Sequence, residues 1–177
     1  SIQKVVSREI DPITPVAVTF GRIEGGTARN VIADRVALVG TARTLSVAAA
    51  QQVAKLIKRT ATAVCRAHGA TLEMNLIADY PVLKNDPRIN RLLAGNFEML
   101  YGRGKIDVTE QVLGGEDFAC YLAEVPGAMY RLGVMNKKIK ADKPWHSPDF
   151  IVDENAIKVG TALMTAAVID FLTDGLP

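Results

Sequence analysis

The sequence predicts an α/β protein in two parts: an incomplete β-α-β-β-α-β split sandwich, followed by a lobe of alternating helices and apolar strands. Residues 16–24 and 35–44 alternate apolar and polar side chains, as half-buried strands do, and a helical segment and a third alternating segment follow. The second part is indicated by helical periodicity after Asp86 and Pro87, a strong start signal for a helix.

The first residues of the chain have the pattern of a helix end and not of a domain start. Residues 1–8 have the pattern of the last turns of a helix, which Pro12 and Pro15 would end. Residues 16–24 and 35–44 read as an antiparallel pair joined by a glycine-containing loop. This order matches the split sandwich only if its first strand and most of its first helix are missing, so we expect a further segment before residue 1.

The helix predicted in the first part has a start signal and a stop signal in the sequence. Ser46 is the predicted N-cap, apolar residues recur at helical spacing from Ala50, and Gly69 has the position of a terminating glycine. His68 reads as a helix-end residue, because cationic side chains suit the C-terminus of a helix. Residues 71–78 alternate again, which predicts the closing strand of the sandwich.

The second part is predicted to contain three helices and one apolar strand. The first helix follows Asp86 and ends at Gly102, and a short helix after a glycine pair is stopped by Pro126. Residues 128–134 can form a buried strand. A loop of roughly twenty residues then leads to Asp153, which caps the last helix; loops of this length are usually functional or disordered.

Composition excludes several classes of partner. The 177 residues carry a net charge of only +2, whereas nucleic acids and acidic membranes require a concentrated basic footprint. The basic cluster around Lys137 lies beside Pro and Asp and is typical of a solvated loop. We see no signal peptide and no long apolar run, so we expect a soluble, cytoplasmic protein with neither nucleic acid nor membrane as partner.

The glycine pair lies in the stretch Gly114-Gly115-Glu116-Asp117-Phe118, close to the Gly-Gly-Glu-Glu-Phe signature of diguanylate cyclases. That signature requires a β-hairpin, whereas the residues after Phe118 have helical period, so a cyclase-like nucleotide enzyme is a remote alternative. A tight turn that leads into a helix explains the pair as well. A third interpretation is a loop whose N–H groups face an anionic or polar substrate.

His146 has metal-binding chemistry and lies in the long loop. Pro144, Trp145 and Pro148 surround it and stiffen the loop. A lone loop histidine is most often a surface residue, and zinc needs three or four protein ligands. No HxH, HExxH or Cys/His cluster accompanies His146, so the chain offers at most one ligand of an incomplete metal site.

Four stretches, in order, resemble one family. They are RIEGGTARNVIADRVALVGTARTL, DYPVLKND, GGEDFACYLAEVPGAMYRLG and WHSPDFIVDENAIKVGTALMTAAVIDFL. Their order and spacing are similar to the aminoacylase/carboxypeptidase family of metallo-amidohydrolases, in its hippurate hydrolase and auxin-conjugate hydrolase branch. The resemblance implies a ferredoxin-like lid and dimerisation domain in residues 1–80, without its first strand. Residues 81–177 would be the C-terminal part of an α/β metallopeptidase catalytic domain.

The resemblance also implies roles for individual residues. His146 matches the last metal ligand of the family, and Asn30 and Arg43 match lid residues that hold the substrate carboxylate. A guanidinium suits this role because it binds a carboxylate in a bidentate manner. Without the resemblance, Asn30 reads as a turn residue and Arg43 as a surface strand residue. The matches in the substrate-side loop are Gly114, Gly115 and Glu116.

The implied activity is the hydrolysis of N-acyl amino acids or related amides by metal-activated water. The divalent metal would be zinc, manganese, cobalt or nickel, in a site that is incomplete in this chain. The general base would lie upstream, so we expect no catalytic residue here and no activity from the chain alone. Implied partners are the missing N-terminal catalytic portion and a second copy, bound through the lid as a homodimer. The alternative is a non-catalytic binding or dimerisation module.

Overall fold

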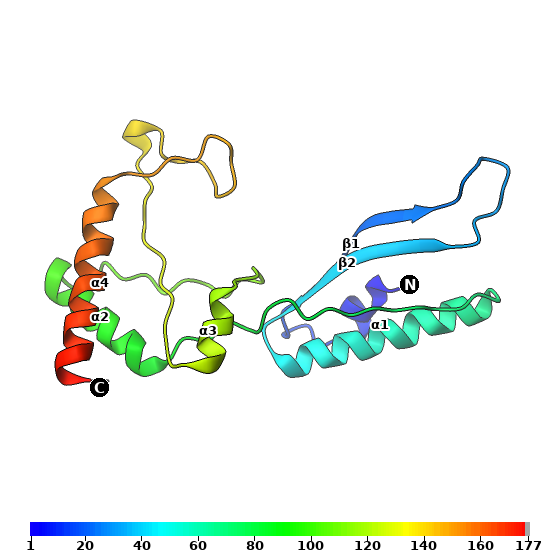
Figure 1. The fold of residues 1–177 in the computed structure, drawn as a ribbon, viewed down its shortest axis with the longest axis horizontal. Coiled ribbons are helices and arrows are strands. Elements are labelled where there is room, and N and C mark those ends of the chain that lie inside the picture. The colour runs from blue at the N-terminus through cyan, green and yellow to red at the C-terminus, as the bar shows by residue number, and fades with distance from the viewer. Residues whose placement is uncertain (176–177) are drawn as a thin grey trace. The chain divides into compact units, whose positions relative to one another are not determined.

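The computed structural model describes residues 1–175, which fold as two compact units (Figure 1). Unit 1 contains residues 1–82 and 111–119, and unit 2 contains residues 83–110 and the chain from Cys120 onward. The segment 111–119, which carries the glycine pair, follows the expected boundary at residue 80 in sequence. It nevertheless packs with unit 1, so the chain passes between the units more than once.

A hairpin forms the sheet of unit 1. β1 (Val16–Gly25) and β2 (Val36–Thr44) pair antiparallel along their lengths, and the predicted antiparallel pair is confirmed. The register shifts between Phe20 and Arg22, where a bulge bends the strand. Among the described residues, these two strands make up the whole sheet.

Helix α1 (Val47–Ala67) follows the hairpin and has the predicted ends. The Ser46 hydroxyl accepts a hydrogen bond from the backbone N–H of Ala49 at 3.1 Å, and such an N-cap contributes about 1 kcal/mol. His68 is the C-cap residue, as expected for a helix-end histidine. Gly69 follows with a φ of +68°, a left-handed conformation that favours glycine.

The core of unit 1 lies where α1 meets the start of the chain. The segment before β1 contains one π-helical turn, η1 (Val5–Glu9), which confirms the expected helical start in a shortened form. Val5 and Val53 are fully buried in this core. The other buried members of the cluster are Ile10, Val18 and Ile57. Val16 and Phe20 also pack against this cluster, so alternate residues of β1 face the core, as the alternation of residues 16–24 predicts.

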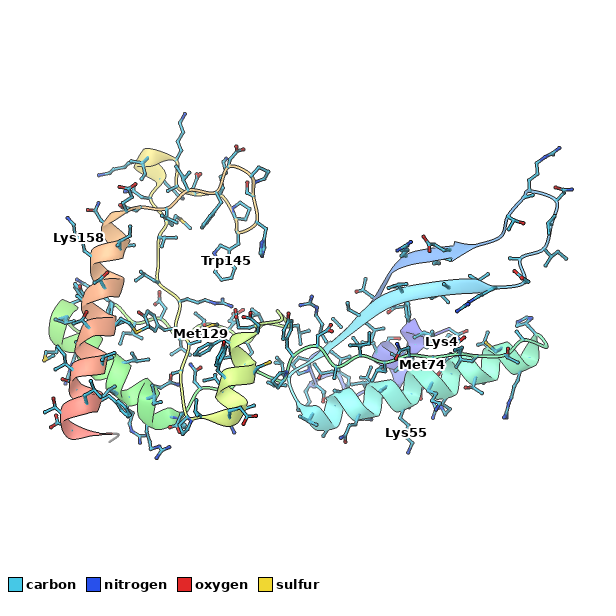
Figure 2. All side chains as sticks on the ribbon, viewed as in Figure 1. Lys4, Lys55, Met74, Met129, Trp145 and Lys158 are labelled. Carbon is cyan, nitrogen blue, oxygen red and sulfur yellow. The ribbon has the colours of Figure 1, made fainter. Side chains whose placement is uncertain are left out.

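Residues 71–78 do not form the predicted closing strand. The segment runs back beside α1 without a backbone ladder, and Met74 packs against the core (Figures 1 and 2). Leu76 is 58% exposed and Ile77 is 74% exposed, so the alternation does not produce a buried face. A strand requires a bonded neighbour. Among the described residues, no strand of the sheet lies beside this segment to pair with it.

Unit 2 is built on two helices that pack together, α2 (Pro87–Tyr101) and α4 (Asn155–Asp174). Asp86 caps α2, because its Oδ1 accepts a 2.8 Å hydrogen bond from the backbone N–H of Arg88. Hydrogen bonds from the Arg88 side chain and backbone lower the pKa of Asp86 to about 2. α2 ends before Gly102, so both predicted ends of this helix are confirmed.

The short helix α3 (Phe118–Glu124) begins after the glycine pair and ends before Pro126, as predicted. Residues 128–134 bond to no neighbouring strand, and the predicted buried strand is wrong. A buried strand of an α/β lobe needs strands beside it, which the described residues do not provide. Two hydrogen bonds between the Asn85 side chain and the Met129 backbone, at 2.8 and 2.9 Å, hold this segment instead.

Helix α4 is long and apolar. By length and composition it could cross a membrane, and 17% of its apolar window is buried within the structure. One such helix is weak support for a membrane span, because core helices of water-soluble proteins pass the same test. This helix does not decide the matter, and the cytoplasmic, membrane-free location stays a prediction. The most exposed apolar residues of α4 are Ile157, Met164, Val168, Ile169 and Leu172.

Candidate functional site

Arg43 lies near the end of β2, opposite Ala17, and its guanidinium reaches the loop that carries the glycine pair. Its Nη1 donates a 2.9 Å hydrogen bond to the carbonyl oxygen of Leu113. The side chain is exposed, and within residues 1–175 its Nε and Nη2 make no hydrogen bond. One edge of the guanidinium is therefore anchored, while the other donors are free to bind a ligand.

Gly115 lies beside the same guanidinium. A methyl group on its Cα would stand 4.0 Å from Nη1 of Arg43 and 3.4 Å from Cδ2 of Tyr80, which are ordinary contact distances. Tyr80 thus belongs to this group, which we name the Arg43 cluster: Arg43, Tyr80, Leu113 and Gly115. Tyr80 and Leu113 were not among the site residues predicted from the sequence. The position of Tyr80 in the DYPVLKND stretch was a usable signal, whereas Leu113 acts through its backbone and offered none.

Glu116 has a local role in the structure. One carboxylate oxygen accepts a 3.3 Å hydrogen bond from the backbone N–H of Phe118, and its carbonyl accepts one from Ala119 at 3.2 Å. The carboxylate thus caps α3, where a negative charge suits the helix dipole. A substrate contact from Glu116 stays a prediction and would have to compete with this bond. Gly114 is exposed beside it.

Asn30 lies away from the Arg43 cluster. It is exposed in the loop between Gly25 and Val36, at the tip of the hairpin, whereas Arg43 is seven residues from Val36 along β2. At the usual rise of a strand this separation is about 23 Å. The structure therefore does not bring the two predicted carboxylate-binding residues together within one chain.

His146 lies in a tight turn of the long loop. The backbone N–H of Ser147 donates a 3.2 Å hydrogen bond to the carbonyl of Pro144, which closes a four-residue turn. His146 has a φ of +62° and Trp145 does not have a positive φ, the pattern of a type II turn. Glycine or asparagine usually occupies this third position, and another residue there costs about 1–3 kcal/mol. The exposed imidazole is thus presented by a strained backbone.

The loop that carries His146 is closed at its base. Asn136 and Ala141 exchange backbone hydrogen bonds of 2.9 and 3.0 Å, around the short helix η2 (Lys137–Ile139). The Asn136 amide also donates a 2.7 Å hydrogen bond to Asp153, and this bond is the main cause that lowers the pKa of that carboxyl. Asp153 Oδ1 accepts a 3.0 Å hydrogen bond from the N–H of Asn155, the first residue of α4, so the expected side chain bonds to the helix start, although the residue directly before α4 is Glu154.

Trp145 packs against a cation from the extended segment that precedes the loop. The guanidinium carbon of Arg131 lies 5.0 Å from the centre of the Trp145 ring. Both side chains are exposed, and Figure 2 shows Trp145 on the stretch between η2 and α4. This is a cation–π contact, which the sequence analysis did not anticipate because no spacing rule links the two positions.

The described residues contain no group of three or more His, Cys, Asp or Glu side chains that could hold a metal ion. The structure fits His146 as one ligand, because its imidazole is exposed on a loop held at its base and at the neighbouring indole. Zinc is held by three or four protein ligands, so His146 by itself does not form a closed site.

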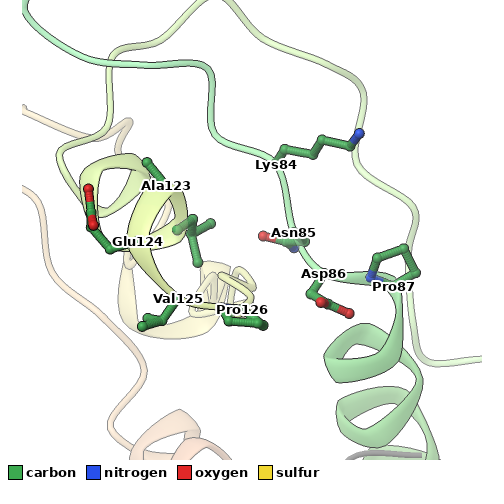
Figure 3. Close-up of a pocket in the computed structure, with 10 residues that line it drawn as sticks. Lys84, Asn85, Asp86, Pro87, Ala123, Glu124, Val125 and Pro126 are labelled. Carbon is green, nitrogen blue, oxygen red and sulfur yellow. The ribbon is translucent and has the colours of Figure 1, made fainter.

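An open pocket of about 380 Å³ lies within unit 2, between residues 84–87 and 122–127 (Figure 3). Its lining carries charges of both signs, from Lys84, Asp86 and Glu124. None of the predicted site residues lines it. Asp86 is already bound to Arg88 and caps α2, so the pocket has the character of a surface hollow.

The glycine pair does not lie between two strands. The helix α3, labelled in Figure 1, begins at Phe118 soon after the pair, whereas the cyclase signature requires a β-hairpin at this point. The geometry therefore disfavours the remote cyclase alternative.

Comparison with known proteins identifies relatives that match most of this chain. Residues 5–170 match the profile of peptidase family M20/M25/M40. A Synechocystis protein described as a probable hydrolase is 36% identical over 168 residues, covering 94% of this chain and 43% of the relative. Thermostable carboxypeptidase 2 of Saccharolobus solfataricus is 31% identical and covers 97% of this chain. The chain spans about 43% of the length of these two relatives.

Solved structures agree with these matches. The structure of an aminohydrolase-type protein from methicillin-resistant Staphylococcus aureus superimposes with a TM-score of 0.81 at 30% identity, over 96% of this chain and 42% of that one. The YXEP protein of Bacillus subtilis, described as a dinuclear metal-binding peptidase from the M20 family, gives a TM-score of 0.76 at 29% identity, over 87% of this chain and 42% of that one. Because the profile match extends over most of the sequence, the chain belongs to peptidase family M20/M25/M40.

Proposed function

We propose that this chain forms part of a metal-dependent hydrolase that cleaves the amide bond of N-acyl amino acids or related peptide-like substrates. Family membership supports a hydrolase, and several relatives bear names that denote amide cleavage next to an amino acid, such as carboxypeptidase, IAA-amino acid hydrolase and N-acetyldiaminopimelate deacetylase. Residues 1–80 would act as the lid, and residues 81–177 would belong to the catalytic domain.

The observation that carries this proposal is the half-anchored guanidinium of Arg43. Its bond to the Leu113 carbonyl fixes one edge beside Gly115, and its remaining donors are free. A planar guanidinium with two free parallel donors matches the two oxygens of a carboxylate. A substrate with a free α-carboxylate beside the scissile amide therefore suits the Arg43 cluster better than a neutral amide would.

We propose His146 as one ligand of the divalent metal centre. A bound divalent metal polarises a carbonyl and lowers the pKa of water. Zinc, manganese, cobalt and nickel all accept imidazole, so the metal is left open. The general base and the other ligands would come from residues outside this chain, which spans less than half of its relatives. The chain by itself should then be inactive.

The test compares the two histidines of the sequence in the metal-loaded enzyme that contains this chain. His146→Ala should lower metal affinity by on the order of tenfold or more, and hydrolysis of an N-acetyl amino acid should fall with it. His68→Ala, at the C-cap of α1, is the matched control and should leave both unchanged. Unchanged metal content in the His146→Ala variant would exclude the ligand role.

We also propose a homodimer through the lid. Arg43 is about 23 Å along β2 from Val36, and Asn30 lies beyond Val36 in the hairpin loop, so a small substrate on Arg43 does not reach Asn30 of the same chain. A second copy could supply that side chain. β2 also presents exposed apolar residues, with Val36 55% and Leu38 52% exposed. Mixing an Asn30→Ala variant with an Arg43→Ala variant tests this: two inactive homodimers should give partly active mixtures, and mixtures without activity would reject it.

A further inference from the structure

We propose that Arg131 is a positioning residue that holds the His146 turn through its contact with Trp145. This inference rests on the proposed role of His146 as a metal ligand and adds the device that orients it. Trp145 is the residue directly before His146, in the second position of the same turn. Any force that fixes the indole therefore fixes the backbone from which the imidazole projects.

The loop needs such a device because its tip has little else to hold it. Residues 142–152 begin and end on one short segment: Ala141 bonds to Asn136, and Asp153 bonds to Asn136 and to the carbonyl of Val134 at 2.9 Å. Between these two anchors the side chains of Trp145 and His146 are exposed. The stack of Arg131 on Trp145, at 5.0 Å, is a third anchor at the tip.

The position of Arg131 in the chain makes this anchor effective. Arg131 precedes Val134 and Asn136 on the same extended segment, which the Asn85 side chain fixes at Met129. The loop is thus attached to a single held segment at its base and at its tip. With a strained His146 backbone, the turn is stable only where its surroundings hold it. Release of the indole would free the turn to relax and move the imidazole.

The first experiment uses the fluorescence of Trp145, which is the single tryptophan of this chain. In the 177-residue chain, Arg131→Leu should increase the quenching of Trp145 by acrylamide and shift its emission. Arg131→Lys keeps a cation over the ring and should retain most of the wild-type signal. Arg91→Leu removes another exposed arginine of unit 2 and is the matched control. Identical quenching in the wild type and Arg131→Leu would overturn the proposal.

The second experiment measures cobalt(II) affinity in the metal-loaded enzyme that contains this chain, for Arg131→Leu, Trp145→Ala and the double variant. The loss of cobalt affinity in the double variant should differ by about two- to fivefold from the product of the losses in the two single variants. This factor is the free energy of an exposed cation–π contact converted to an equilibrium constant. The double variant is needed because Arg131→Leu also removes a positive charge, whose effect on a bound cation persists without the ring.

The outcomes separate this inference from the proposed function. If His146→Ala leaves cobalt affinity unchanged, the ligand role fails. If His146→Ala abolishes binding while Arg131 and Trp145 show no coupling, the ligand role stands and the positioning role is wrong. A coupling of two- to fivefold, together with looser packing of the indole in Arg131→Leu, supports both.

Discussion

Substitution of Arg43 by lysine tests the proposed carboxylate site, because the change keeps the positive charge and removes the planar fork. In the structure the guanidinium bonds to the Leu113 carbonyl through one edge and leaves the remaining donors free. Lysine cannot do both, since its ammonium group is a compact charge without a second parallel donor pair. The variant should bind substrate carboxylate through fewer and less directed hydrogen bonds.

The expected size follows from the loss of one hydrogen bond to a charged group. Such a bond contributes about 1.5–3 kcal/mol, which corresponds to a rise of roughly tenfold to more than a hundredfold in KM for an N-acyl amino acid. Exposure of Arg43 places the effect toward the lower end of this range. The fold should not change, because the side chain is exposed and its anchor is a single hydrogen bond.

The assay compares an N-acyl amino acid with the same compound carrying a C-terminal amide, in the complete metal-loaded enzyme. Wild type should prefer the free carboxylate, and Arg43→Lys should lose most of this preference. Arg22→Lys, on β1 and paired with Glu24, is a matched control on the same hairpin. An unchanged KM for the acid, or an equal loss for acid and amide, would refute the reasoning.

Three further predictions concern the chain itself. First, the 177-residue chain should bind zinc or manganese only weakly, since His146 is one ligand where three or four are needed; stoichiometric sub-micromolar binding in a calorimetric titration would contradict this. Second, the lowered pKa of Asp86 stabilises the fold above pH 3.8, and this contribution is lost as the pH falls toward 2. Denaturant melts of the Asp86→Asn variant should therefore show a smaller loss of stability between pH 3.8 and 2 than melts of the wild type. Identical pH profiles for the two proteins would argue against this role of Asp86. Third, exposed apolar surface on β2 and α4 should prevent a stable monomer, because its burial contributes about 25 cal/mol per Å²; light scattering that shows a cooperative 19.1 kDa monomer would oppose this.

Helix ends were predictable because their signals are local. Ser46, Asp86 and Asp153 each bond to a backbone N–H one turn or less away, and the glycines that end α1 and α2 have positive φ. The pairing of β1 with β2 was also predictable, since the two strands are adjacent in sequence and joined by one glycine-containing loop. These features depend on residues only a few positions apart.

The strands predicted at 71–78 and 128–134 are absent from the structure because a strand depends on residues far away in the sequence. Alternation or an apolar run predicts a residue set that suits a strand, but a strand also requires a neighbour at long range. The contacts of the candidate site also join residues that are distant in sequence, so local patterns do not predict them. Tyr80 and the Leu113 carbonyl join Arg43 across long stretches of sequence, and Arg131 meets Trp145 without any local pattern. The sequence pointed to Arg43 and His146 through family resemblance, but not to the Leu113 carbonyl that anchors Arg43 or to the contact of Arg131 with Trp145.

The central claim is that His146 binds the metal of an M20-type hydrolase. The most direct test is anomalous diffraction at the zinc edge, on crystals of the zinc-loaded enzyme that contains this chain. The account predicts a zinc peak with a nitrogen of His146 at about 2.0–2.1 Å. It also predicts that the Trp145 ring remains stacked on Arg131 in that structure. Zinc held entirely by other residues, with the His146 imidazole in solvent, would contradict the account.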